Sequence, residues 1–150
     1  MKHQLRIGLF LLLAFLVSGC ANDSLAASPA PTAEPLVVAD KASLTAALEA
    51  AGATVETGES VSQAFFTPDG SIIGVNGADI QVFEYESPEE MENEASQVSS
   101  DGGSIGTSMV TWMDAPHFYK TGRIIVLYVG SDAAVLDLLE GALGPQFAGR

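Results

Sequence analysis

The chain has 150 residues, of which 19 are acidic, 6 are basic and one is cysteine. This length suits a single domain, and a hydrophobic content of 47% can supply a packed core. The excess of carboxylates argues against binding to nucleic acid or to anionic lipid headgroups, because like charges repel. One cysteine excludes a disulfide within the chain, so Cys20 must be free, paired between chains or covalently modified.

The first 20 residues contain the parts of an export signal in the expected order. Lys2 and Arg6 form a positively charged segment before an uncharged apolar run over residues 7–17. A bilayer-spanning helix needs about 20 apolar residues, so this run suits the core of a signal peptide better. The run leads into Val17-Ser18-Gly19-Cys20, an aliphatic residue and two small residues before cysteine. This motif resembles the lipobox of bacterial lipoproteins.

The lipobox resemblance implies that residues 1–19 are a signal peptide and that the Cys20 thiol carries a diacylglycerol. The protein would then be anchored to a membrane on its extracytoplasmic side, periplasmic or at the cell surface. Two or more acyl chains hold a protein stably, at about 0.8 kcal/mol per buried CH₂. The competing interpretations are a secretory signal with a chance cysteine and an uncleaved anchor. Residue 21 is alanine, not the aspartate that resembles an inner-membrane retention signal, which favours an outer membrane where one exists.

Cleavage before Cys20 would also change the charge of the chain. It would remove two of the basic residues and leave four basic against 19 acidic residues. Residues 20–40, behind the lipidated cysteine, are small, polar and interrupted by Pro29, Pro31 and Pro35. Proline favours extended backbone, so we predict a flexible tether that reaches about 25 Å as a coil and up to about 60 Å when extended. The alternative for its end, Leu36 to Val38, is the start of a first strand.

The regular pattern that follows predicts a single α+β domain over residues 41–150. Asp40 or Ser43 can cap a first helix, and Gly52 can end it. Asn76-Gly77 is the clearest turn signal, because a type I′ hairpin turn needs positive φ at both central positions. Four segments around it look like strands: residues 53–57, 63–67, 71–75 and 78–85.

A second hairpin and two further helices are predicted in the rest of the domain. Ser87-Pro88 resembles a capped helix start, and Ser131 or Asp132 can cap a last helix. Residues 124–129 are apolar at every position, as in a central strand covered on both faces. The other predicted strands are residues 106–113 and 117–120, with Thr121-Gly122 as the second hairpin turn.

This order predicts an antiparallel or mixed sheet built from hairpins, with about three helices mainly on one face. A strand, a tyrosine and a capped helix occur in residues 78–91 and again in residues 123–136. Either a unit has been duplicated, or both halves obey the same capping rules.

Residues 112–123 bring aromatic and basic side chains together within a short stretch. Aromatic side chains with one or two cations suit recognition of a ligand or protein partner. The alternative interpretation is core aromatics with charges at strand ends. The predicted binding residues are Trp112, His117, Tyr119, Lys120 and Arg123.

Other chemistry finds weaker support in the sequence. Met109, Met113 and His117 are spaced by four and could offer ligands to Cu(I) or haem from one helix face, but β-branched residues and Pro116 argue against a helix there. Asp114 beside His117 lacks a nucleophile motif such as GxSxG. Six glutamates within residues 84–94 lack the spacing of a calcium loop and suit a solvated helix face. We therefore predict no catalytic residues, no metal ligands and no cofactor.

Phrases in the domain such as Val82-Phe83-Glu84-Tyr85 and Pro116-His117-Phe118-Tyr119 resemble small bacterial proteins with no assigned activity, many of them predicted lipoproteins. The resemblance spans most of residues 41–150 and implies a folded domain. The sequence thus predicts an anchored, non-enzymatic binding module whose partners are the membrane, through Cys20, and an envelope protein or small ligand. The alternatives are a small-ligand, metal or haem carrier that uses the region from Met109 to Tyr119 and, third, a hydrolase.

Overall fold

The computed structural model describes residues 37–150. The predicted signal peptide, the Cys20 lipidation site and most of the predicted tether lie outside the described residues. No helix in the described part is long and apolar enough to cross a membrane. The elements in chain order are α1 (Lys41–Ala50), β1 (Val55–Val61), β2 (Gly70–Val75), β3 (Ala78–Glu84), α2 (Pro88–Ala95), β4 (Ser104–Ile105), β5 (Ser108–Met109), β6 (Pro116–Thr121), β7 (Ile124–Val129), α3 (Ala133–Leu143) and β8 (Ala148–Gly149).

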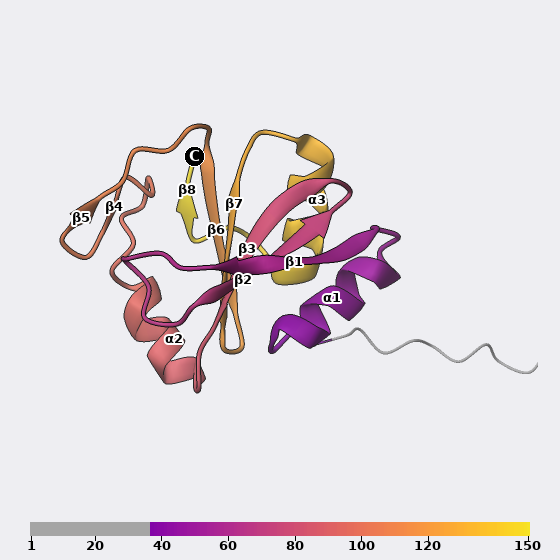
Figure 1. Ribbon diagram of the computed structural model, residues 1–150, viewed down its shortest axis with the longest axis horizontal. Coiled ribbons are helices and arrows are strands. Elements are labelled where there is room, and N and C mark those ends of the chain that lie inside the picture. The colour runs from indigo at the N-terminus through magenta and orange to yellow at the C-terminus, as the bar shows by residue number, and fades with distance from the viewer. Residues whose placement is uncertain (1–36) are drawn as a thin grey trace, which may run out of the picture. The chain divides into compact units, whose positions relative to one another are not determined.

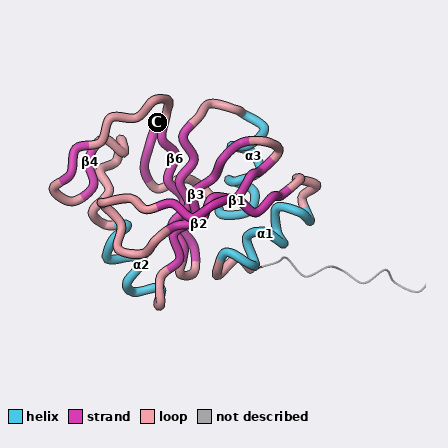
Figure 2. Tube along the Cα trace, viewed as in Figure 1, coloured by secondary structure: helices cyan, strands magenta, loops and turns pink. Residues whose placement is uncertain are grey.

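Six strands form one sheet in the order β1-β2-β3-β7-β6-β8, and every neighbouring pair is antiparallel. The short strands β4 and β5 pair separately. Figure 2 shows strands of the six-stranded sheet crossing at the centre of the domain, with the helices and the β4–β5 pair at its periphery. This arrangement confirms the predicted α+β fold with a sheet built from hairpins.

The apolar strand β7 lies at the middle of the sheet and is buried from Ile124 to Tyr128. Successive side chains of a strand point to opposite faces. Ile124 and Val126 therefore join one buried cluster, while Ile125 and Leu127 join the other. The prediction of a central strand covered on both faces is confirmed.

Helices α1 and α3 cover one face of the sheet, and α2 covers the other (Figure 1). On the first, the α1–α3 face, Leu48 and Leu139 are fully buried. On the second, the α2 face, Met91 packs with phenylalanines of the strands and of the loop before β2. Two of the three helices in residues 37–150 thus share a face. The order hairpin–helix occurs twice, but α2 and α3 lie on opposite faces, so the repeated order does not produce a repeated packing.

Predicted capping and turn residues have these roles in the structure. The Asp40 carboxylate accepts from the Ser43 amide at the start of α1, and the Ser87 hydroxyl accepts from the Glu90 amide at the start of α2. Such caps satisfy amide groups that have no partner inside the helix. Asn76 has φ of 52° and the following glycine has φ of 88°, as the predicted hairpin turn requires.

The predicted strand over residues 63–67 is wrong, because this segment is a turn in which the Phe66 amide donates to the Gln63 carbonyl. Phe65 and Phe66 both pack on the α2 face, which two successive residues of a strand cannot do. The predicted strand over residues 106–113 is confirmed only at Ser108–Met109, which form the short strand β5. Gly106, with φ of +57°, reverses the chain between β4 and β5, and residues 110–115 are irregular.

The packed domain also begins before residue 41, inside the segment predicted as tether. Val38 is buried in the core. Its carbonyl accepts from the Thr121 hydroxyl at 3.2 Å, and the Ala39 carbonyl accepts from the Arg123 amide at 2.9 Å. Residues 38–40 therefore lie against the β6–β7 hairpin turn.

Candidate functional site

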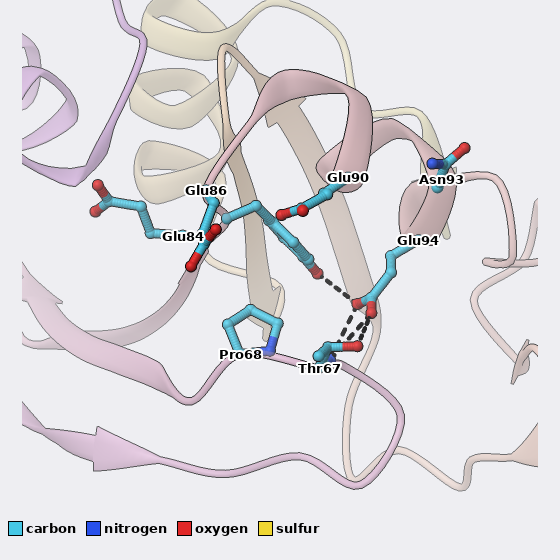
Figure 3. Close-up of a pocket in the computed structure, with 8 residues that line it drawn as sticks. Thr67, Pro68, Glu84, Glu86, Glu90, Asn93 and Glu94 are labelled. Atoms are coloured by element: carbon cyan, nitrogen blue, oxygen red, sulfur yellow. Dashed lines mark hydrogen bonds between the residues drawn. The ribbon is translucent and has the colours of Figure 1, made fainter.

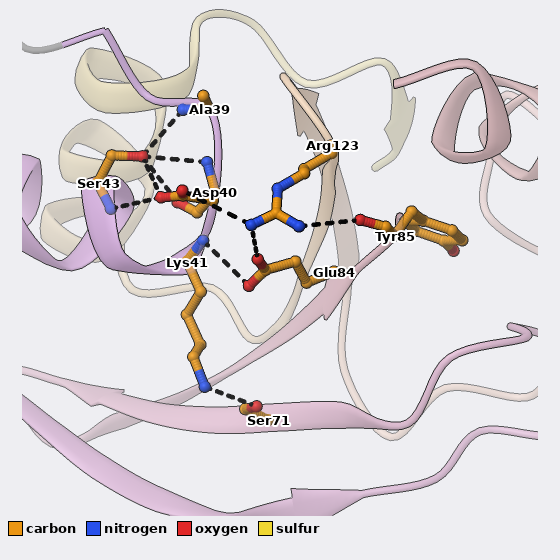
Figure 4. A network of polar contacts seen from close by, with 8 residues as sticks. All are labelled: Ala39, Asp40, Lys41, Ser43, Ser71, Glu84, Tyr85 and Arg123. Atoms are coloured by element: carbon orange, nitrogen blue, oxygen red, sulfur yellow. Dashed lines mark hydrogen bonds and ion pairs between the residues drawn. The ribbon is translucent and has the colours of Figure 1, made fainter. Parts of the chain in front are cut away.

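Arg123, a predicted binding residue, is the centre of a polar network at the β6–β7 turn (Figure 4). Its guanidinium lies 2.5 Å from the Glu84 carboxylate and 3.7 Å from that of Asp40, and it donates to the Tyr85 carbonyl at 3.4 Å. Hydrogen bonds from Ser43 hold the pKa of Asp40 below its ordinary value, with a smaller contribution from the Arg123 charge. Arg123 thus connects the hairpin to the start of α1 and the end of β3.

A groove of about 580 Å³ lies between α2, the end of β3 and the loop before β2 (Figure 3). The Glu94 carboxylate accepts from the Tyr85 hydroxyl at 2.8 Å and from the amide and hydroxyl of Thr67. Burial, followed by the hydrogen bond to Glu94, raises the pKa of Tyr85. These hydrogen bonds fasten the loop before β2 and the end of β3 to α2. Its lining residues are Thr67, Pro68, Glu84, Tyr85, Glu86, Glu90, Asn93 and Glu94.

Trp112 and Lys120 both lie on the α2 face and serve its packing. The indole of Trp112 meets the ring of Phe118 edge-to-face at 5.8 Å and donates to the Gly102 carbonyl at 2.7 Å. The Lys120 ammonium lies 2.5 Å from the Glu92 carboxylate and 5.0 Å from the centre of the Phe147 ring. These contacts explain both side chains without a ligand.

His117 and Tyr119 lie two residues apart on β6, and both side chains point to the α1–α3 face. Both line a second cavity of about 350 Å³, which we call the His117–Tyr119 cavity. It is bounded by β6, by α3 and by the segment between α3 and β8. The lining residues are His117, Tyr119, Leu136, Glu140, Pro145 and Gln146.

His117 is only 7% exposed, and both of its ring nitrogens have oxygen partners. Nε2 lies 3.1 Å from the Gly130 carbonyl, which can only accept, so Nε2 carries a proton and donates. Nδ1 lies 2.6 Å from the Gln146 side-chain amide, which can accept or, after rotation of the amide, donate. The ring also stacks on Tyr128 at 6.0 Å. His117 therefore forms a fixed wall of the cavity.

The Tyr119 hydroxyl, unlike the ring nitrogens of His117, makes no hydrogen bond to any residue of the described part. The residue is only 3% exposed. No fully buried side-chain nitrogen or oxygen in residues 37–150 lacks a hydrogen-bond partner, so the Tyr119 oxygen retains access to solvent, and the cavity that it lines provides that access. Burial, followed by the negative charge of Glu140, raises the pKa of Tyr119. The cavity therefore contains a neutral hydroxyl with unused hydrogen-bonding capacity.

The five predicted binding residues thus do not form one surface. The structure brings His117 and Tyr119 together, places Trp112 and Lys120 on the opposite face, and puts Arg123 at the hairpin turn. Sequence reasoning missed Leu136, Glu140 and Gln146. The first two are spaced by four on α3, which places them on one side of a helix, but nothing in the sequence indicated which strand that side would meet.

The predicted carrier region is also not assembled into a ligand set. Met109 is 92% exposed and Met113 is fully exposed, whereas His117 is turned into the domain. Among residues 37–150, no group of three or more histidine, cysteine, aspartate or glutamate side chains has the geometry to hold a metal ion.

No protein-family model, curated protein or solved structure matches this chain.

Proposed function

We propose that this protein is a lipoprotein anchored to the extracytoplasmic side of a membrane through lipid on Cys20, and that its domain is a non-enzymatic binding module. The lipobox resemblance supports the anchor. The observation that carries the binding proposal is the His117–Tyr119 cavity, where a buried tyrosine offers a hydroxyl that no described residue uses. The hydroxyl is reached by solvent through the cavity and makes no hydrogen bond to a described residue, so it is available to a ligand atom without loss of an existing hydrogen bond within the domain.

The composition of the cavity favours binding over catalysis. Among the described residues, its lining contains no serine, threonine or cysteine nucleophile. Both ring nitrogens of His117 already have partners within 3.1 Å, so the ring is not free to take a proton from a substrate. What remains is recognition: a hydroxyl, a carboxylate and an amide beside the apolar side chains of Leu136 and Pro145.

The anchor is tested by Cys20→Ser in the full-length chain, with Ser24→Ala as the matched control. We expect the control to stay in the membrane fraction with a lipid-modified mature mass. The Cys20 variant should leave the membrane or accumulate unprocessed, since it lacks the thiol that accepts the diacylglycerol. Unchanged fractionation and unchanged mature mass in this variant would reject the anchor.

The binding site is tested by photocrosslinking in cells. A photoreactive residue is placed at Pro145, on the rim of the cavity, or at Pro88, the first residue of α2 on the opposite face. Both prolines are exposed. We expect an adduct, seen as an added mass on the intact protein, from position 145 and none from position 88. Equal labelling at both positions, or none at 145, would contradict binding at this cavity.

A further inference from the structure

No basic side chain of residues 37–150 lines the His117–Tyr119 cavity. The described part of the chain has four basic side chains, Lys41, Lys120, Arg123 and Arg150. Three already have partners: Lys41 donates to the Ser71 hydroxyl, Lys120 pairs with a glutamate of α2, and Arg123 forms the network at the hairpin turn.

The charge of the cavity is therefore negative, and its source is Glu140. This residue lies on the exposed side of α3, and its carboxylate forms no salt bridge with any described residue. Its charge reaches Tyr119, whose pKa it helps to raise after the larger effect of burial. A carboxylate and a neutral hydroxyl thus face the same small space, and both can accept hydrogen bonds.

We propose that the His117–Tyr119 cavity binds a small organic cation that carries a primary ammonium group. An ammonium group has three N–H donors and no acceptor. The Glu140 carboxylate supplies the opposite charge and one acceptor, and the Tyr119 oxygen supplies a second. The Leu136 and Pro145 side chains contact the carbon part of the ligand. This assignment rests on the proposed binding function of the same cavity and names its ligand class.

Size and charge both exclude other classes. A volume of about 350 Å³ is at the lower end of the range for small-molecule sites, roughly 300–1,000 Å³, so the ligand is small. An anion would approach Glu140 and a domain with an excess of acidic residues, which repel it. A neutral polar ligand could use the Tyr119 hydroxyl but would gain nothing from the carboxylate.

The experiment is an NMR titration of the ¹⁵N-labelled full-length protein in a non-ionic detergent at pH 7, so that detergent headgroups do not compete. Three probes of similar size differ in charge: ethanolamine is a cation, ethylene glycol is neutral and glycolate is an anion. We expect saturable shifts with ethanolamine for the backbone amides of residues 117–119, 136–140 and 146–147. Ethylene glycol and glycolate should leave these amides unchanged.

Two variants assign the contacts. Tyr119→Phe removes one oxygen and should weaken ethanolamine binding about tenfold, as expected for a hydrogen bond to a charged group. Glu140→Gln should abolish the preference for the cation over the neutral probe, and because this residue is exposed the variant should fold normally. The matched controls, Tyr85→Phe and Glu89→Gln, lie on the α2 side of the domain and should bind ethanolamine like the unmodified protein.

The proposal is overturned if ethanolamine produces no saturable shifts at these amides, or if ethylene glycol or glycolate binds as well as ethanolamine. It is also overturned if Glu140→Gln keeps the full preference for the cation. Binding of the neutral or anionic probe in the cavity would reject the ligand class and leave the cavity as a binding site. Absence of a crosslink from position 145 in cells would instead reject the binding function, so the two failures can be told apart.

Discussion

The glycine at the β6–β7 turn is expected to be one of the least replaceable residues of the domain. Gly122 has φ of +54°, which costs a residue with a side chain about 1 kcal/mol. A Cβ there would lie 2.3 Å from the Ala39 carbonyl oxygen and 2.4 Å from the Ala39 Cα. These are backbone atoms, so residues 38–40 or the turn must move, at a further cost of about 1–3 kcal/mol. We expect Gly122→Ala to lose about 2–4 kcal/mol of unfolding free energy.

The matched control is Gly77→Ala at the β2–β3 turn. Gly77 also has a positive φ, +88°, but a Cβ there meets nothing within 4 Å, so only the conformational cost of about 1 kcal/mol applies. Urea unfolding followed by the fluorescence of Trp112, the single tryptophan, measures the loss of unfolding free energy in both variants, and thermal unfolding measures their melting temperatures. In a domain of about 100 residues the two variants should lower the melting temperature by about 8–16 °C and about 4 °C, respectively. Equal losses would show that residues 38–40 do not pack on the hairpin.

Three further predictions concern the helices. Leu48, fully buried in α1, should cost about 2–5 kcal/mol when replaced by alanine, and a loss below 1 kcal/mol in urea unfolding would contradict its place in the core. Ser87→Ala removes the N-cap of α2 and should cost about 1 kcal/mol, whereas Ser96→Ala at the other end of the helix should cost less. The pKa of Asp40 is lowered chiefly by the Ser43 hydroxyl, so its contribution to stability is present above pH 4 and is lost as the pH falls through the lowered pKa. Between pH 5 and pH 2 the stability of Ser43→Ala should therefore fall less than that of the unmodified protein, and parallel pH profiles would refute this.

The features that could be predicted from the sequence are those in which a local rule and the final fold agree. Asp40 and Ser87 cap helices with their own side chains, and Asn76-Gly77 adopts the positive φ angles that only a few residues tolerate. The apolar run of β7 needs cover on both faces wherever it lies. Each of these features depends on fewer than ten neighbouring residues, so it could be predicted without the tertiary structure.

The strand predictions for residues 63–67 and for most of 106–113 failed because a strand-like composition does not determine how the segment packs or where its backbone turns. The segment 63–67 has strand-like composition, but Phe65 and Phe66 both turn to the α2 face, where Phe66 packs on Phe83 at 4.8 Å. In residues 106–113 the expected strand is broken at Gly106, whose backbone reverses the chain. The contact of Phe66 with Phe83 joins residues far apart in the sequence, which periodicity does not record. The positive φ of Gly106 is a local property that the strand-like composition around it does not indicate.

The division of the predicted binding residues has the same origin. Residues 117–120 are adjacent in the sequence, and adjacency on a strand guarantees that alternate side chains face opposite ways. His117 and Tyr119 could therefore share a site only with each other, and their remaining partners had to come from elsewhere in the chain.

Further residues beside His117 and Tyr119 come from α3 and from the segment after it, which runs back to β6. Gly144 ends α3 with φ of +81°, and β8 then pairs with the start of β6. This return brings Gln146 to within 2.6 Å of His117, 29 residues away in the sequence. The bond between these two side chains fixes one wall of the cavity, and α3 provides another wall with Glu140. A pattern search within the stretch that holds His117 and Tyr119 could not have found a site whose charge and closing wall lie on two later segments.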